Sequence, residues 1–292
     1  MSSISLGSQS NSKIGRAIFK QAYNALKQDT QVLAIPFLAF LATLAAGVLI
    51  VVSWILLIPA MEIYDASGII QPALGIVMAF FASNIHVVSQ AAVMAAANDR
   101  FNGNNPTVGK SLAFAFKKYG QLSLFGFLEA TVGLVLRAIQ ERLGFIGALL
   151  RVIGGLLWAV ATYFAIPGII FGGQTATESI KSSVVLIKEK WGNALKTNIV
   201  AGAVIALIFL TGLGVLLSGV GLLVTDETGN LLYSGLSLIG SGVVIFLIGG
   251  LLQASVMAYV KVALYRYATG QSLPGFDDAL LGQAFKVKNS SI

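Results

Sequence analysis

Charged residues, cysteine and histidine are all scarce in this chain. Charged residues make up 11% of its 292 residues, whereas a soluble domain carries about 25%, so the chain has too little charge for a surface that faces water throughout. Cysteine is absent, which excludes disulfide bonds and thiolate metal sites. His86 is the single histidine, which excludes a metal site with several histidine ligands in one copy.

The sequence also lacks the short motifs of several enzyme classes. It contains no H-E-x-x-H, no G-x-x-x-x-G-K-[ST] and no G-x-S-x-G pattern, which are signatures of zinc proteases, P-loop nucleotide hydrolases and serine hydrolases. Its glycine-rich stretch at residues 212–221 has no strand-turn-helix context, so we interpret it as a helix-packing surface rather than a nucleotide site. We therefore predict that the protein is not an enzyme and binds no cofactor or metal ion.

Long apolar runs fill most of the chain instead. Hydrophobic residues make up 56% of it, and the mean hydropathy is +0.84. Runs of about 20 residues cross about 30 Å of hydrocarbon as helices, because lipid offers no partner for unpaired backbone groups. We predict six membrane spans at about 32–60, 71–97, 121–139, 149–171, 199–223 and 234–264.

The basic residues predict an orientation for these spans. Of the 19 Lys and Arg residues, 16 fall in four segments on one side of the predicted membrane: 1–31, 98–120, 172–198 and a tail after about 261, which includes Lys261 and Arg266. Loops rich in Lys and Arg stay in the cytoplasm, so both termini are predicted to be cytoplasmic. The same distribution explains the net charge of +7, and we expect no nucleic-acid partner.

The chain also reads as three related units and a tail. The units cover about 12–105, 106–173 and 174–270, and the cytoplasmic tail covers 271–292. Residues 90–95 resemble residues 253–258, and residues 118–121 resemble residues 190–193. The predicted fold is therefore an all-α membrane protein, with six transmembrane helices as three hairpins, each preceded by a cytoplasmic amphipathic helix.

The three predicted amphipathic helices carry basic residues on their polar faces. In the third helix, Ile180, Val184, Ile187 and Trp191 form the apolar face, and Thr175 with Glu178 forms a capping box at its start. We expect these helices to lie among lipid headgroups, with basic side chains near anionic lipid. A docking surface for a partner protein is the alternative. The basic residues at this interface are Lys13, Arg16, Lys20, Lys110, Lys117, Lys118, Lys181, Lys188 and Lys190.

A few polar residues lie deep within the predicted spans. Glu129 is the only acid at such depth, where a charge costs at least about 2.5–3.5 kcal/mol. His86 and Gln90 share one face of the second span, and Gln253 lies at a similar depth in the sixth. We predict an intramembrane polar cluster of Glu129, His86, Gln90, Gln253, Thr162 and Tyr163. It is either a hydrogen-bonded structural cluster or a proton-coupled ligand site, with Glu129 as proton carrier and His86 as relay.

Packing within the bundle is expected at small residues spaced four apart, such as Ser237 and Ser241. Pro167 lies in the fourth span, and it leaves the carbonyl group of Tyr163 without its usual donor, so we expect a helix kink there.

One segment resembles a known family. Residues 158–167 form the pattern W-x-V-A-T-Y-F-x-x-P, and they are followed by a predicted amphipathic helix that ends near Trp191 and Gly192. This pattern resembles a prokaryotic six-span integral membrane protein family of unknown function. More loosely, the architecture is similar to the membrane domain of glycerophosphodiester phosphodiesterases. The resemblance implies a prokaryotic plasma-membrane location and assigns no catalytic residue.

Together these observations favour a non-enzymatic scaffold, assembly or lipid-interacting component of the plasma membrane. The alternative is a small-molecule or lipid transporter that uses the polar cluster around Glu129. The lipid bilayer is the expected partner, with anionic lipid at the cytoplasmic face. A homo-oligomer and a membrane-protein partner are both left open.

Overall fold

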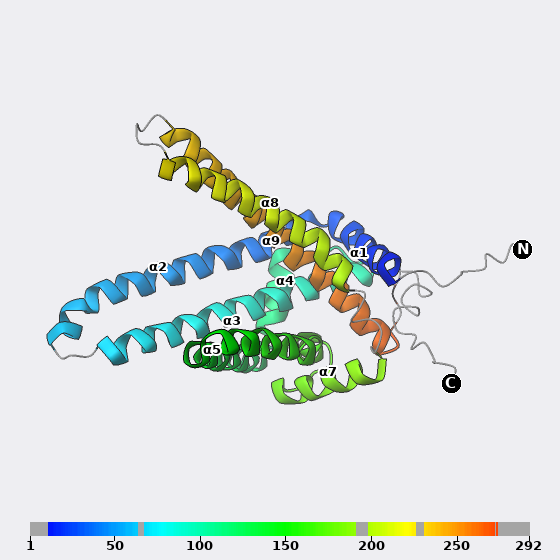
Figure 1. The fold of residues 1–292 in the computed structure, drawn as a ribbon. Coiled ribbons are helices and arrows are strands. Elements are labelled where there is room, and N and C mark those ends of the chain that lie inside the picture. The colour runs from blue at the N-terminus through cyan, green and yellow to red at the C-terminus, as the bar shows by residue number, and fades with distance from the viewer. Residues whose placement is uncertain (1–10, 64–66, 191–197, 226–230, 272, 274–292) are drawn as a thin grey trace, which may run out of the picture.

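The fold is built from helices, several of which are long enough to cross a membrane (Figure 1). The computed structural model describes residues 11–63, 67–190, 198–225, 231–271 and 273, and every regular element in these ranges is helical. By length and composition, four helical segments qualify as membrane spans: Thr30–Pro59, Gly68–Phe101, Tyr119–Ile170 and Leu232–Ala268. The protein is therefore an all-α protein with apolar helices of membrane-spanning length.

The first pair of long helices forms a hairpin that extends to the left in Figure 1. A short 3₁₀ helix, η1 (Thr30–Leu33), leads into α2 (Ala34–Ile63), which packs against α3 (Ser67–Phe101). Their contact includes Gly47, where an added Cβ atom would lie 3.6 Å from the Met78 methyl group. The large side chains of α2 are mostly exposed, which suits helices surrounded by lipid rather than by water.

The helix α5 (Tyr119–Ala161) reverses direction at Gly144, whose φ of 55° and ψ of −125° are not helical. A Cβ atom on Gly147 would lie 2.5 Å from the Ile139 carbonyl oxygen, and one on Gly154 would lie 2.7 Å from the Leu136 side chain. In a continuous helix these pairs would be about 12 Å and about 27 Å apart. The two halves of α5 therefore run antiparallel.

Glycines hold α8 (Asn198–Thr225) against α9 (Leu232–Ala268). A Cβ atom on Gly219 would lie 2.7 Å from the Gly235 carbonyl oxygen, and one on Gly242 would lie 3.0 Å from that of Gly212. The glycine-rich stretch is thus confirmed as a packing surface, because backbones approach this closely only where side chains are absent. The packing predicted at Ser237 and Ser241 is wrong: both are exposed, and the seven-residue spacing of the α9 glycines places them at the contact instead.

The remaining helices are short: α1 (Asn11–Lys27), α4 (Val108–Phe116), α6 (Ala165–Ile170) and α7 (Ala176–Lys190). Along α1, Ile18, Ala22 and Leu26 are buried, and Arg16 and Lys20 are exposed.

The end of the fourth predicted span is broken between α5 and α6. Residues 162–164 are not helical, and Pro167 occupies the first turn of the fully buried α6. Proline suits a first turn, because the N–H groups there have no partner within the helix. The interruption thus lies just before Pro167, which is part of the new helix rather than the point of the bend.

The capping box at the start of α7 is confirmed. The Thr175 N–H donates to the Glu178 carboxylate at 2.9 Å, and the Glu178 N–H donates to the Thr175 hydroxyl at 3.3 Å.

The predicted apolar face of α7 is shifted. Ser179 and Ser183 are fully buried, whereas Ile180 and Val184 are only half-buried. The Ser183 hydroxyl accepts a hydrogen bond from the Phe164 N–H at 3.0 Å, and Phe164 lies in the break between α5 and α6. Trp191 lies outside the described residues.

The core lies where the long helices α3 and α9 meet the short helices α1 and α6. Its buried residues come mainly from α1, residues 87–101 of α3, α6 and residues 256–265 of α9. We call this end of the molecule, together with α4 and α7, the base, and we call the parts of the hairpins beyond it the arms. In Figure 1 the arms extend to the left, whereas α1 and α7 lie to the right.

Candidate functional site

A polar cluster lies where α3, α5 and α9 approach one another. The Ser83 hydroxyl on α3 contacts the Gly126 carbonyl oxygen at 2.8 Å and the Glu129 carboxylate at 3.4 Å. Glu129 is half-buried and lies ten residues beyond the start of α5, or about 15 Å along the helix. The carboxylate is therefore held against α3 at a depth within the candidate span.

Lys261 of α9 is the central cation of this cluster. Its ammonium group donates to the Gln90 side-chain oxygen at 3.4 Å and lies 5.2 Å from the centre of the Tyr163 ring. It also lies within electrostatic range of Glu129. Gln90 in turn contacts the His86 ring nitrogen at 2.7 Å. The cluster thus joins one side chain from α9 to both of the other hairpins.

Only part of the predicted polar cluster comes together in this way. Glu129, His86, Gln90 and Tyr163 are each linked to Lys261 or to one of its partners. Gln253 lies eight residues before Lys261, or about 12 Å along α9, and no described hydrogen bond connects it to the cluster. The Thr162 hydroxyl donates to the carbonyl oxygen of Trp158 one turn earlier, at 2.8 Å.

Sequence reasoning missed Lys261 because it assigned this residue to the cytoplasmic tail. The helix α9 continues to Ala268, so Lys261 lies on a helix within the packed base. A signal for this was present: apolar residues continue on both sides of Lys261, from Val256 to Leu264. A lysine within such a run suggests a buried partner of opposite charge, and Glu129 is the only deep acid.

The electrostatics of the cluster depend on the pairing of opposite charges. An isolated charge in a low-dielectric region is strongly disfavoured, whereas an ion pair with further hydrogen bonds offsets much of that penalty. Glu129 has the Ser83 hydroxyl as a hydrogen-bond partner and Lys261 as a nearby opposite charge, and Lys261 has Gln90 and the face of Tyr163. Such an arrangement can fix three helices together, and its ionisable groups can also hold a proton.

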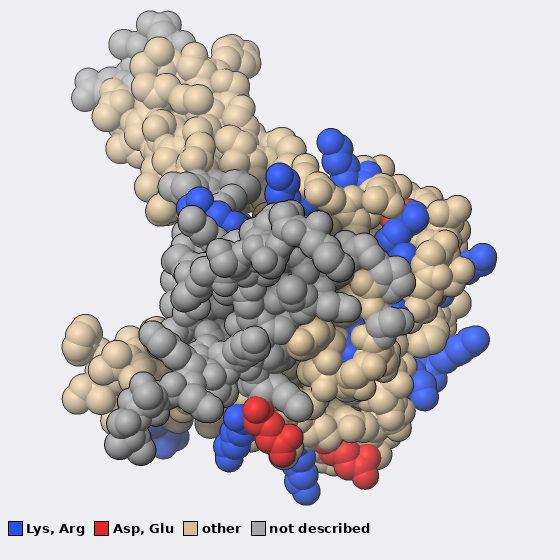
Figure 2. Space-filling view, turned by 90° about the vertical axis from the view of Figure 1, so that its right-hand side faces the viewer, with Lys and Arg blue, Asp and Glu red and all other residues tan. Residues whose placement is uncertain are grey.

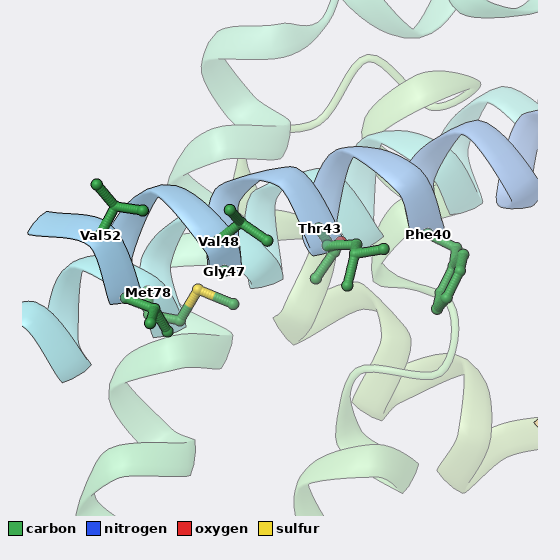
Figure 3. A pocket seen from close by; sticks show the side chains of 8 residues that line it. Phe40, Thr43, Gly47, Val48, Val52 and Met78 are labelled. Atoms are coloured by element: carbon green, nitrogen blue, oxygen red, sulfur yellow. The ribbon is translucent and has the colours of Figure 1, made fainter. Parts of the chain in front are cut away.

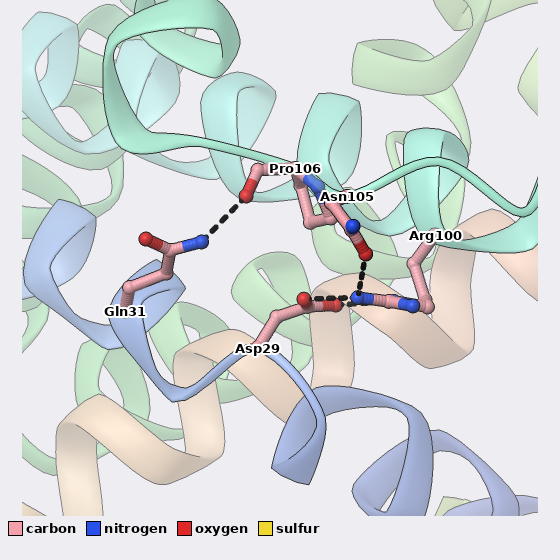
Figure 4. A network of polar contacts seen from close by, with 5 residues as sticks. All are labelled: Asp29, Gln31, Arg100, Asn105 and Pro106. Carbon is pink, nitrogen blue, oxygen red and sulfur yellow. Dashed lines mark hydrogen bonds and ion pairs between the residues drawn. The ribbon is translucent and has the colours of Figure 1, made fainter.

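A second polar network joins the start of the chain to the end of α3 (Figure 4). Arg100 forms a two-pronged ion pair with Asp29, which is only 4% exposed, and also donates to the Asn105 side-chain oxygen at 3.1 Å. Beside it, the Gln31 side chain donates to the Pro106 carbonyl oxygen at 2.7 Å. This network fixes the turn after α1 against the segment that leads into α4.

Arg266 makes a third link at the base, between α9 and α3. Its guanidinium donates to the Asn98 oxygen at 3.2 Å and to the Asn102 oxygen at 2.9 Å. The side chain is only 6% exposed. Arg266 thus lies in the last turns of α9 and packs against α3 rather than in a tail beyond the helix, and its cytoplasmic location stays a prediction.

A cavity of about 520 Å³ lies along α2 and faces α3 (Figure 3). Its walls are apolar and include Phe40, Val48, Val52 and Met78. Thr43, the one hydroxyl in the wall, already donates to the Ala39 carbonyl oxygen at 2.8 Å. The cavity therefore offers hydrocarbon contact and no polar chemistry.

The predicted interfacial basic residues fall on the short helices of the base. Arg16 and Lys20 on α1, Lys110 on α4, and Lys117 and Lys118 just after it are exposed. Lys181 and Lys188 on α7 are exposed as well. Lys13 and Lys190 lie at the ends of α1 and α7, and their side chains are outside the described part. Figure 2 shows Lys and Arg side chains spread over this face, with few acidic ones.

Within the described ranges, no three His, Asp or Glu side chains converge as a metal site would require.

A family of unknown function, DUF6159, matches residues 73–275 of this chain. The match covers more than half of the chain, and the chain belongs to this family. No curated protein and no solved structure matches it. The similarity to phosphodiesterase membrane domains stays a prediction.

Proposed function

We propose that this member of an uncharacterised family is a non-enzymatic, lipid-interacting scaffold of a prokaryotic plasma membrane. In this proposal six spans form three hairpins, each preceded by an amphipathic helix at the cytoplasmic face, and both termini are cytoplasmic. A membrane-protein partner or a second copy would assemble on the exposed arms. The following observations support the proposal.

Three features support the six-span arrangement. The fold-back at Gly144 makes two antiparallel helices of α5, and α8 with α9 forms a further hairpin. Gly103, Gly173 and Gly270 all have positive φ angles, between 65° and 79°. These three glycines follow α3, α6 and α9, so a left-handed residue ends the return helix of each proposed unit. The recurrence supports a threefold repeat.

The exposed Lys and Arg residues on α1, α4 and α7 support the proposed orientation (Figure 2). Because the chain has no cysteine, single cysteines can be introduced without a background. We expect Lys20→Cys and Lys188→Cys to react with a membrane-impermeant maleimide only from the cytoplasmic side. We expect Phe145→Cys, beside the turn of α5, to react only from the opposite side. Reaction of all three from one side would contradict the six-span arrangement.

The hydrogen bonds from Ser83 to Gly126 and Glu129, with Lys261 as the nearby opposite charge, carry the scaffold proposal. The partners of Glu129 belong to other hairpins, so the pairing holds the hairpins together. We therefore assign the cluster a structural role and the exposed arms and basic base the role of binding lipid.

Native mass spectrometry of protein released in mild detergent tests this function. We expect the wild-type protein and Glu129→Gln to retain the same phospholipids, with the variant less stable. Arg142→Gln, an exposed change on α5 beside the Gly144 turn and away from the base, serves as control. Absence of any retained lipid or partner from both proteins would contradict the proposal.

The alternative function is transport of a small molecule or lipid, and one observation favours it. Glu129 and Lys261 are ionisable groups on different hairpins, so loss of a proton could alter the contact between them. Dicyclohexylcarbodiimide, which modifies protonated carboxyl groups within membranes, separates the two functions. The scaffold predicts that Glu129 resists modification unless Lys261 is replaced by Met. Rapid modification in the wild-type protein, relieved by a transported solute, would favour the transporter.

A further inference from the structure

A second cavity, of about 280 Å³, lies at the base between α3, α4 and the end of α6. Unlike the cavity along α2, it carries charges of both signs. Lys110 and Lys117 line one side, and Asp99 of α3 lines another. Two phenylalanines, Phe114 and Phe171, complete its apolar wall. The cavity thus combines two cations, one anion and an aromatic surface.

The two lysines are arranged by the local structure of α4. They are seven residues apart, so they lie on one face of a helix, with Phe114 between them. The Thr107 hydroxyl fixes the start of this helix, since it accepts a hydrogen bond from the Lys110 N–H at 3.3 Å. Both side chains are exposed, so their ammonium groups are accessible to a ligand.

Asp99 stands across the cavity from these lysines. In the part of the chain that the structure describes, it forms no ion pair with either of them. The neighbouring Asn98 is held by Arg266 at 3.2 Å, which fixes the α3 wall. The separation of opposite charges leaves room for a molecule that itself carries both signs.

The aromatic wall indicates the source of that molecule. The Phe114 and Phe171 rings lie 6.2 Å apart, and Phe171 continues to Tyr265 at 6.3 Å. Tyrosine and tryptophan concentrate where membrane meets water, and Tyr265 adjoins this wall. The cavity also adjoins the end of α3, a helix of membrane-spanning length. In the proposed membrane arrangement, such a helix ends at the depth of the phospholipid headgroups.

We propose that this cavity binds the headgroup of an ethanolamine phospholipid. The phosphate lies between Lys110 and Lys117, and the primary ammonium donates to Asp99, with the acyl chains directed along the apolar surface of the arms. A purely anionic headgroup would satisfy the lysines but would leave Asp99 beside a negative charge. A choline headgroup has no N–H donor for Asp99. The inference rests on the proposed lipid-interacting function and specifies one site for it.

The test measures retention of three synthetic lipids with identical oleoyl chains: phosphatidylethanolamine, phosphatidylglycerol and phosphatidylcholine. Native mass spectrometry of the full chain gives the retention of each lipid for the wild-type protein and the variants. We expect the wild-type protein to prefer phosphatidylethanolamine, and Lys110→Gln/Lys117→Gln to lose about tenfold or more of that retention, as removal of charge-assisted contacts implies. Asp99→Asn should shift the preference toward phosphatidylglycerol. Arg142→Gln, an exposed loss of positive charge on α5 beside the Gly144 turn and away from the base, should behave as wild type.

Free phosphoethanolamine and inorganic phosphate serve as competitors in a second arm. If the headgroup and its chains both contribute, neither competitor displaces the lipid at concentrations near that of the lipid. Displacement by inorganic phosphate alone would overturn the lipid assignment. Unchanged phosphatidylethanolamine retention in both the lysine and the Asp99 variants would overturn the site while leaving the lipid-interacting function intact. Absence of every lipid from the wild-type protein would instead contradict that function.

Discussion

The long helices of this protein run through both the arms and the base, but different contacts hold them together in the two regions. In the α8/α9 arm, contact depends on the absence of side chains, because Gly219 meets the backbone at Gly235. At the base, contact depends on polar side chains from distant segments, such as Asp29 with Arg100 and Lys261 with Gln90. Where lipid surrounds helices, burial of apolar surface gives little drive for association. Close backbone contact therefore serves the arms, and specific polar pairing serves the base.

The largest effect is expected from a break in the buried pair at the base. Asp29→Ala removes the carboxylate of the Arg100 ion pair from a site where Asp29 is 4% exposed, and leaves the guanidinium only its hydrogen bond to Asn105. Removal of one member of a buried pair costs about 3–5 kcal/mol. We expect the free energy of unfolding to fall by that amount in titrations with SDS in mixed micelles.

The exposed pair of Arg137 with Glu141 provides the control. Glu141→Ala should change stability by less than about 1 kcal/mol. Equal effects of the two variants would contradict the distinction between buried and exposed pairs.

The glycine contact in the α8/α9 arm gives the next largest effect. An alanine at Gly219 would place a Cβ atom 2.7 Å from a carbonyl oxygen and 2.8 Å from the Ile239 backbone nitrogen. We expect Gly219→Ala to destabilise the protein by about 1–3 kcal/mol, as overpacking does. Gly221 has open space around it, so Gly221→Ala should be neutral or slightly stabilising. The same unfolding titration compares them, and a neutral Gly219→Ala would show that the arm does not depend on backbone contact.

The smallest effect concerns the edge of the base, where α7 begins. Hydrogen bonds from the Thr175 backbone N–H and hydroxyl lower the pKa of Glu178. Because the folded pKa is below the unfolded one, the contribution is present above the unfolded pKa of about 4.3 and is lost as pH falls through the folded pKa.

Hydrogen exchange at the Thr175 amide, corrected for the intrinsic rate, measures this effect. Protection should stay constant from neutral pH down to about pH 4.3, should fall as the medium is acidified further, and should be insensitive to pH in Glu178→Gln. The amide of Lys110 at the α4 cap, where Thr107 acts without an acid, is the control. Equal pH dependence at both caps would contradict the role of Glu178.

Much of the helical structure could be predicted from the sequence, because apolar runs and caps are local signals. The runs at 32–60 and 71–97 correspond to α2 and α3, and the capping box of Thr175 with Glu178 forms as expected. The gap predicted between 139 and 149 contains the reversal at Gly144. In each case a few neighbouring residues determine the outcome.

The pairing between segments could not be predicted in the same way. Asp29 and Arg100 are 71 residues apart, and the period of a helix gives no reason to join them. Lys261 was assigned to a tail because positive charge near the end of a span usually lies in the cytoplasm. The buried Ser183 of α7 accepts from the Phe164 N–H, which lies in the break between α5 and α6. These features depend on tertiary contacts.

The electrostatic interaction between Glu129 and Lys261 offers the most direct test, since it lies where the arms enter the base. A double-mutant cycle of Glu129→Gln and Lys261→Gln, read as unfolding free energy in lipid-containing micelles, isolates the energy of the pair. A structural pair predicts a coupling of about 1–2 kcal/mol, in the upper range of polar contacts between membrane helices. Additive single effects, within about 0.5 kcal/mol, would contradict the account and leave Glu129 available for another role.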